Sequence, residues 1–332
     1  MGPSSAPVIR VTGNAPCILC ATLPGDEARS AHQKKERLMY PFPPVSLHDV
    51  TCFSQNTASS QGLVPLFTPH DCRIIYSGQV DAYSMKSLIE TINLAFGYYQ
   101  YNQITIDIES PGGEIRALHY LMGQFDFWRA QGRRIATRAS ISASSAAAAI
   151  LALGDQGERS VERSTTVLYH FARIFQTNSV LTAEKATDMA QKMNREDERM
   201  IDQLLTHIVG PLDDLEAADW HGLAMVRLDW AKSFLARKND RTHFYFPEAQ
   251  VRLKSLGKLL TAKGKITLRE RVQGYLKNIF LKDEPIDLLE AWCLNLIDEI
   301  RDVTPMLVPP KVFQEIGLQP ENKGRKALVA GL

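Results

Sequence analysis

Strand-like and helix-like patterns alternate along this chain from residue 73 to residue 210, and this alternation limits the folds that it can adopt. Ile104, Ile106 and Ile108 alternate strictly with polar residues, which is typical of a strand. Apolar residues recur at helical spacing on both sides of that strand, before it at Met85, Leu88, Ile89, Ile92 and Phe96, and after it at Ile115, Leu118, Met122 and Phe125. Because parallel strands are joined by crossover helices, we predict an α/β fold with a parallel sheet.

The remaining elements follow the same alternation. A long helix with an apolar face from Ala186 to Ile208 is predicted to end at Gly210-Pro211. The other predicted elements are strands at Arg73–Tyr76, 133–141 and Thr165–Tyr169, a tight turn at Ser110–Gly113, a buried helix at Ser145–Leu153, and a last strand at Leu296–Ile300.

Composition divides the chain into four parts. Residues 1–66 are rich in Pro, Ser and Thr and lack a sustained period, which predicts a poorly ordered N-terminal extension. Residues 67–210 and 266–304 carry the alternating core. Between them, residues 211–265 break the rhythm and are predicted to be an insertion, and residues 305–332 form a C-terminal tail.

Charge and composition favour a cytoplasmic globular protein. The 332 residues carry a net charge of +1, which gives no electrostatic footprint for nucleic acid or an anionic membrane. No apolar run is long enough to span a bilayer, and the N-terminus lacks a signal sequence. The five cysteines are few and scattered, and Cys17 and Cys20 lack the second pair that a zinc site needs, so we predict no metal and no cofactor.

A serine and a histidine in this core could perform acyl transfer. Ser145 begins an Ala-rich helix, and His170 closes a strand 25 positions later. A serine hydroxyl becomes a good nucleophile only when a neighbouring base takes its proton. The amides of Gly113 and Ala146 are candidate donors to an oxyanion. Each residue alone is more often structural: small residues suit a tight helix contact, and a histidine often ends a strand.

Read together, these motifs resemble the proteolytic subunit of Clp protease (ClpP). Its first core strand and Gly-Gln-Val turn are similar to residues 73–80, and its Ser-Pro-Gly-Gly oxyanion loop is similar to Ser110–Gly113. Its nucleophile helix is similar to residues 143–154, and its strand ending in the catalytic histidine is similar to residues 166–170. The resemblance implies a ClpP/crotonase-like spiral of β-α-β units with Ser145 as nucleophile and His170 as base. The Ala-rich helix is closer to phage- and plasmid-type members.

The same resemblance indicates the third member of a triad. Asp213, Asp214 and Asp219 lie near the end of the long helix, but their flanking sequence fits the family poorly. Asp283 lies 12 positions before Asn295, where the family has glycine, and Leu296–Ile300 follows the family's Leu-Val/Ile-Asp-x-Ile pattern. We therefore expect Asp283 to orient the imidazole.

The family resemblance implies a serine endopeptidase that acts on peptides or unfolded proteins, forms a homo-oligomeric ring and can work with an AAA+ unfoldase. Two departures weaken the expectation of two stacked rings. The family's glycine-rich stretch after the histidine is replaced by residues 171–176, and its acidic residue two positions before the aspartate is Leu281.

Two other classes of function stay open. A non-catalytic ring component or assembly scaffold would agree with the altered ring-joining segment and the insertion. A crotonase-like acyl-CoA enzyme would share the fold and the oxyanion hole, but it needs no Ser-His-Asp set and usually works with a carboxylate acid or base. We rank the peptidase first, the scaffold second and the acyl-CoA enzyme third.

Overall fold

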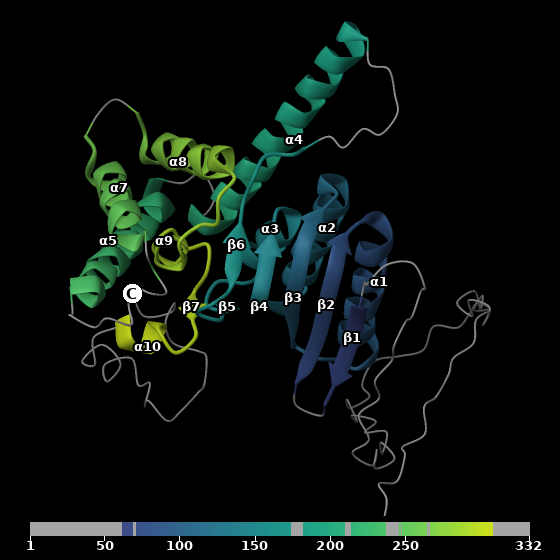
Figure 1. Ribbon diagram of the computed structural model, residues 1–332. Helices are drawn as coiled ribbons and strands as arrows, with labels where there is room; N and C mark the ends of the chain where they lie inside the picture. The colour runs from purple at the N-terminus through teal and green to yellow at the C-terminus, as the bar shows by residue number, and fades with distance from the viewer. Residues whose placement is uncertain are drawn as a thin grey trace, which may run out of the picture. The chain divides into compact units, whose positions relative to one another are not determined.

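The computed structural model describes residues 62–68, 71–173, 182–209, 214–236, 246, 248–263 and 266–307 (Figure 1). All of these residues belong to the second of two compact units, which comprise residues 1–48 and 49–332. Residues 1–61 of the expected extension, Gly210-Pro211, Asp213 and the tail after residue 307 lie outside the described residues.

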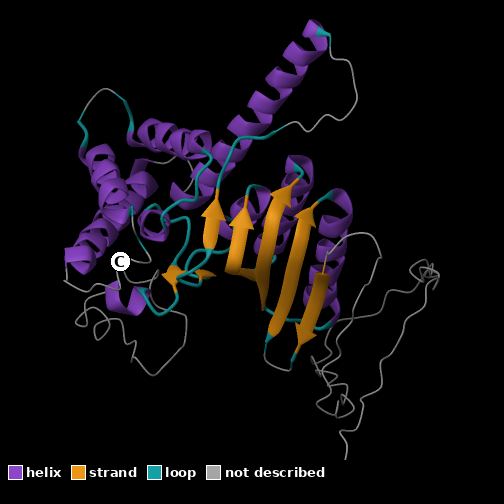
Figure 2. Cartoon of the chain, viewed as in Figure 1, coloured by secondary structure: helices purple, strands orange, loops and turns teal. Residues whose placement is uncertain are grey.

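A seven-stranded sheet forms the centre of the unit, and all its pairings except β1–β2 are parallel (Figure 2). The strand order is β1-β2-β3-β4-β5-β7, with β6 paired to the end of β4. The strands are β1 (Gly62–Phe67), β2 (Cys72–Val80), β3 (Gln103–Gly113), β4 (Arg134–Ser144), β5 (Arg159–Val161), β6 (Thr166–Leu168) and β7 (Glu299–Ile300). The predicted α/β fold with a mostly parallel sheet is confirmed.

Helices connect the strands and carry the predicted apolar faces. Figure 2 shows α1 and α2 lying behind the strands, where Leu88 and Leu118 are buried. The helices are α1 (Ala82–Asn93), the π-helix η1 (Leu94–Tyr98), α2 (Ile115–Ala130), α3 (Ala146–Ala152), α4 (Ala183–Val209), α5 (Asp214–Ala236), α7 (Ala249–Thr261), α8 (Leu268–Lys282), α9 (Leu288–Cys293) and α10 (Thr304–Leu307).

Several element boundaries differ from the sequence predictions; the last strand, for example, comprises only Glu299–Ile300 of the predicted Leu296–Ile300. Residues 62–66, expected in the N-terminal extension, form most of β1, which pairs antiparallel with β2 along the edge of the sheet. Ser110–Gly113, expected as a tight turn, forms the last residues of β3, because Gly112 and Gly113 continue the pairing with β2 opposite Gln79 and Val80. Residues 305–307, expected in the tail, belong to α10.

The segment predicted as an insertion packs into the common core. Trp220, Leu228 and Ala231 on α5 are buried, as are Leu253 and Leu256 on α7. These side chains belong to the same hydrophobic cluster as the sheet and its helices. Within the described residues, the 211–265 segment therefore adds to the core that carries the sheet.

A buried network of charged side chains joins the C-terminal segment to the sheet. Asp298 accepts hydrogen bonds from Nε and Nη2 of Arg159, both at 2.8 Å, and from the Gly157 amide at 2.8 Å. Arg227, from α5, lies 3.6 Å from the same carboxylate and donates to the Trp292 carbonyl at 2.7 Å. This network fixes β5, β7 and α5 relative to one another.

The charge balance of this network favours an ionised Asp298. Burial acts to raise the pKa of this carboxyl, but the charge and hydrogen bonds of Arg159 and the charge of Arg227 outweigh burial and lower it. A lowered pKa means that the stabilisation is present above the carboxyl's unfolded-state pKa and is lost as the pH falls through its folded-state value.

Replacing Asp298 with Asn should destabilise the fold strongly. The change leaves two buried guanidinium groups without a counter-charge, which costs about 3–5 kcal/mol when one partner of a buried pair is removed. Chemical denaturation at neutral pH measures the free energy of unfolding, with the neighbouring, partly exposed Glu299→Gln as the control. A loss below about 1 kcal/mol, the range of exposed ion pairs, would show that the network is not essential.

Candidate active site

Ser145 lies on a strained turn between β4 and α3. Its backbone has φ 57° and ψ −125°, a conformation that residues with a side chain adopt at a cost of about 1–3 kcal/mol. The Ser145 amide donates to the Leu168 carbonyl at 2.7 Å, which ties the turn to β6. The chain therefore turns sharply here and leaves the Ser145 side chain partly exposed at the carboxyl edge of the sheet.

Glycine is required where β3 passes this turn. Gly112 has φ +90°, and a Cβ on it would lie 2.5 Å from Cβ of Ser145 and 3.0 Å from the Ala146 nitrogen. A Cβ on Gly113 would overlap the Val80 carbonyl. The Ser-Pro-Gly-Gly segment therefore lies directly against the turn, and any side chain at residue 112 would cover the amide at the start of α3.

His170 follows β6, the strand next to β4. The parallel register sets Ser144 opposite Leu168, so Ser145 and His170 leave adjacent strands at the same edge of the sheet. The His170 ring is partly buried, and its Nδ1 lies 2.7 Å from the Phe171 carbonyl. Because a carbonyl only accepts, this contact assigns the proton of a neutral ring to Nδ1 and leaves Nε2 as the acceptor.

The segment that carries Asp283 lies on the other side of β6. Leu168 forms an antiparallel bridge with Pro285, and the Ile286 amide donates to the Val167 carbonyl at 2.9 Å. Figure 1 shows the chain descending beside β6 after it leaves α8. His170 lies two residues after Leu168 and Asp283 two residues before Pro285, so this bridge brings the backbone segments that carry them close to one another.

The Asp283 side chain itself is half-exposed and forms an ion pair with Arg173. Asp283 ends α8 in the left-handed conformation, with φ 55°, which aspartate tolerates better than most residues. Among the described residues, no hydrogen bond joins the side chains of Ser145, His170 and Asp283. Their backbone segments are brought together, while the imidazole contacts Phe171 and the carboxylate contacts Arg173.

Asp197, on α4, is a second carboxylate beside His170 that the sequence analysis missed. It is 6% exposed and accepts a hydrogen bond from the Ala172 amide at 2.8 Å. Burial raises its pKa, against the opposing effects of that amide and of His170. Its position was a usable signal, because Asp197 interrupts the apolar face of the helix between Met193 and Met200.

The rejected carboxylates near the end of α4 lie elsewhere. Asp219 is exposed on α5, and Asp214 is the first residue of that helix. Within the described ranges, no cluster of three or more His, Cys, Asp or Glu side chains is arranged to bind a metal ion. None of the helices described there combines the length and the apolar content needed to cross a bilayer.

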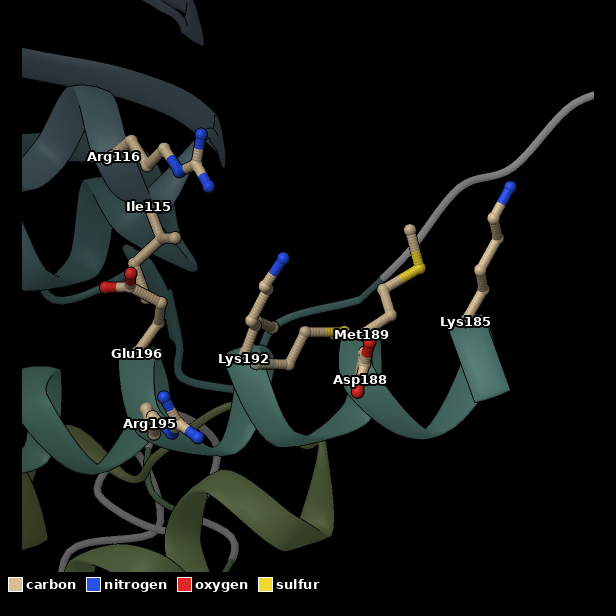
Figure 3. A pocket seen from close by; sticks show the side chains of 10 residues that line it. Ile115, Arg116, Lys185, Asp188, Met189, Lys192, Arg195 and Glu196 are labelled. Carbon is tan, nitrogen blue, oxygen red and sulfur yellow. The ribbon is translucent and has the colours of Figure 1, made fainter. Parts of the chain in front are cut away.

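A pocket of about 600 Å³ borders the site between the start of α2 and the exposed part of α4 (Figure 3). Ile115, two residues after Gly113, and Ala172, two residues after His170, form part of its wall. The side chains from α4 are mostly charged or methionine: Lys185, Asp188, Met189, Lys192, Met193, Arg195 and Glu196. The pocket therefore begins just beyond the end of β3, which carries the candidate oxyanion donor Gly113, and just beyond His170, the candidate base that follows β6.

The fold and this edge of the sheet define an α/β protein with a strained turn between strand and helix at Ser145. A family model described as Clp protease matches residues 68–219, just under half of the chain. Residues 68–219 are therefore similar to the Clp protease family, as the motifs predicted, which supports a peptidase-type domain in this segment. A search of curated proteins finds no match.

Adding a methyl group at residue 112 should destabilise the fold, whereas adding one at residue 123 should not. Gly112→Ala forces a Cβ against Ser145 at a positive φ, and overpacking of this kind costs about 1–3 kcal/mol. Gly123, on α2, has open space around it, so Gly123→Ala should stabilise the helix by about 0.5–1 kcal/mol. Chemical denaturation of both variants measures the difference, and equal free energies of unfolding would contradict the close approach of β3 to Ser145.

Proposed function

We propose that this chain is a serine endopeptidase that hydrolyses peptide bonds through an acyl-enzyme. The Ser145 hydroxyl attacks the peptide carbonyl while Nε2 of His170 takes its proton, and the imidazolium then protonates the leaving amine. Water attacks the ester in the same way, releasing the acid and restoring the serine. Asp283 holds the Nδ1–H tautomer and stabilises the imidazolium, and the amides of Gly113 and Ala146 bind the oxyanion.

The observation that carries this proposal is the position of β6 between two segments. On one side, β4 supplies Ser145, and its amide contacts Leu168 at 2.7 Å. On the other side, Pro285 bridges Leu168, two residues away from Asp283 on one segment and from His170 on the other. The backbone order is therefore nucleophile, base and acid, which is the order of the side chains in a Ser-His-Asp triad.

The backbone geometry also favours the two oxyanion donors. Ala146 is the first residue of α3, where an amide has no partner within the helix. The Glu114 amide donates to the Val80 carbonyl at 2.7 Å, toward β2. Because amide directions alternate along a strand, the preceding amide, that of Gly113, is directed toward the opposite edge, where β4 and Ser145 lie.

Assembly of the relay requires Asp283 to move from Arg173 to Nδ1 of His170. Both members of the Arg173–Asp283 pair are more than 40% exposed, and such pairs are worth about 0–1 kcal/mol, so the rearrangement costs little. Asp197 is less suited to this role, because its carboxylate is occupied by the Ala172 amide and burial disfavours its charged form.

Further parts of the proposal rest on the family. We propose protein or peptide substrates, a homo-oligomeric ring and a cytoplasmic location, with an AAA+ unfoldase as a candidate partner. The proposed reaction uses no metal, nucleotide or other cofactor. The net charge of +1 supports neither nucleic acid nor a membrane as a partner.

The non-catalytic scaffold is the second candidate. The observation that favours it is the set of side-chain contacts at the site, in which His170 contacts Phe171 and Asp283 contacts Arg173. A crotonase-like acyl-CoA enzyme is a more distant third. A test of CoA binding separates it from the peptidase.

Replacing Ser145 with Ala should abolish labelling by a fluorophosphonate, because the probe forms its bond with an activated serine hydroxyl. Labelling is measured by gel fluorescence and by mass spectrometry of the modified peptide. Ser144→Ala, one residue earlier, is the matched control and should label as the parent does. Equal labelling of Ser145→Ala and the parent would refute the assignment, and an unlabelled parent would favour the scaffold.

The two carboxylates beside His170 should differ in their effect on catalysis. Asp283→Asn should slow fluorophosphonate labelling by about 10⁴-fold, as removal of the orienting acid does in a triad, and Asp197→Asn by less than 10-fold. The rate–pH profile of Asp283→Asn should also shift to lower pH, because the imidazolium loses its counter-charge. The reverse ranking would make Asp197 the orienting acid.

A further inference from the structure

We infer that Arg252, on α7, is a positioning residue that holds the Asp283 loop beside His170. This inference rests on the proposed function and extends it to the segment predicted as an insertion. The loop comprises residues 283–287, between the end of α8 and the start of α9. It carries the proposed orienting acid at its first residue.

An ion pair connects α7 to this loop. Nη2 of Arg252 lies 3.1 Å from Oε2 of Glu284, the residue next to Asp283. The same guanidinium binds Glu248, at the start of its own helix, through Nε at 3.1 Å. Arg252 and Glu284 are 32 positions apart in sequence, so the contact is tertiary.

The Arg252 side chain is held more firmly than its two exposed partners. It is 11% exposed, whereas Glu248 and Glu284 are 64% and 60% exposed. A third carboxylate, the buried Glu290 on α9, also interacts electrostatically with Arg252 and accepts a hydrogen bond from Tyr275. The guanidinium is therefore a fixed point to which an otherwise exposed loop side chain is attached.

The rest of the loop is fixed at residues further along the chain. Pro285 and Ile286 pair with β6, and the Asp287 side chain caps α9 by accepting from the Leu289 amide at 2.9 Å. Both of these attachments follow residue 284. The Arg252 contact is therefore the one nearest to Asp283 among the described attachments that bind the loop to another helix or strand, apart from the exposed Arg173 pair.

This arrangement affects catalysis more than stability. An exposed glutamate in an ion pair adds little to the free energy of unfolding. A triad carboxylate displaced by about 1 Å, in contrast, can slow the reaction by up to about 100-fold. Loss of the Arg252–Glu284 pair should therefore slow the chemistry without unfolding the protein.

The test compares two glutamates that bind the same arginine. Glu284→Gln removes the contact to the loop, and Glu248→Gln removes the contact within α7. The second-order rate constant for fluorophosphonate labelling of Ser145 is measured against pH in the full-length protein. Labelling needs no knowledge of the substrate, and its pH profile is sensitive to the charged groups on the segments around His170, which include Asp197 and the Asp283–Arg173 pair.

We expect Glu284→Gln and Arg252→Gln each to slow labelling by about 10-fold to 100-fold and to shift the profile to lower pH. Glu248→Gln should match the parent, and Arg252→Lys should recover part of the rate, because a lysine can still reach Glu284. The double variant Arg252→Gln/Glu284→Gln should be no slower than either single variant, since both remove one interaction. Circular dichroism and thermal unfolding check that each variant is folded.

Two results would overturn the inference. One is parent-like labelling of Glu284→Gln, and the other is equal slowing by Glu248→Gln and Glu284→Gln, which would indicate a general charge effect. The variant Asp283→Asn distinguishes failure of this inference about Arg252 from failure of the proposed triad. Slow Asp283→Asn with parent-like Arg252→Gln and Glu284→Gln refutes the inference alone, whereas parent-like Asp283→Asn refutes the triad and the inference with it.

Discussion

The bidentate pair between Arg159 and Asp298 is the interaction on which the C-terminal part of the fold depends. The two residues are 139 positions apart, and both are almost completely buried. A buried arginine is unfavourable unless its charge is matched, so the chain that contains Asp298 must return to the short strand β5. Its return places β7 beside β5 and completes the sheet after a long segment whose described helices are α4, α5, α7, α8 and α9.

The position of the candidate active site depends on this return of the C-terminal segment to the sheet. Once residues 288–300 are fixed against the sheet, the preceding residues lie along β6, where Pro285 and Ile286 pair with Leu168 and Val167. The opposite edge of β6 is already occupied by β4 and by the turn at Ser145. Three segments that are distant in sequence thus meet at one short strand. The triad is proposed here because the backbone segments that carry Ser145, His170 and Asp283 meet at this strand.

Much of the sheet was predictable because its signals are local. The alternation of Ile104, Ile106 and Ile108 predicted the central strand β3. Asn295 stands where the Clp protease family has glycine, and it adopts a left-handed φ of 63°, which asparagine tolerates better than most residues. The local prediction failed at Ser110–Gly113, because glycine permits both a turn and an extended strand and the sequence alone does not distinguish the two. Ser-Pro-Gly-Gly was interpreted as a turn, but in the structure Gly112 and Gly113 extend β3 past the turn at Ser145. The three residues of β5 are too few for a period to reveal, and the strand predicted at Leu296–Ile300 is reduced to the two residues of β7.

Side chains whose role depends on distant partners could not be predicted. Arg159, Arg227 and Arg252 are ordinary surface residues on composition alone, and their significance comes from carboxylates far along the chain.

The central claim, that Asp283 orients His170 in a Ser-His-Asp triad, is tested most directly by a crystal structure of the assembled protein with a phosphonate bound to Ser145. The account predicts His170 Nδ1 within hydrogen-bond distance of Asp283, about 2.6–3.2 Å, with Arg173 released. An imidazole that instead binds Asp197, with Asp283 still paired to Arg173, would contradict it.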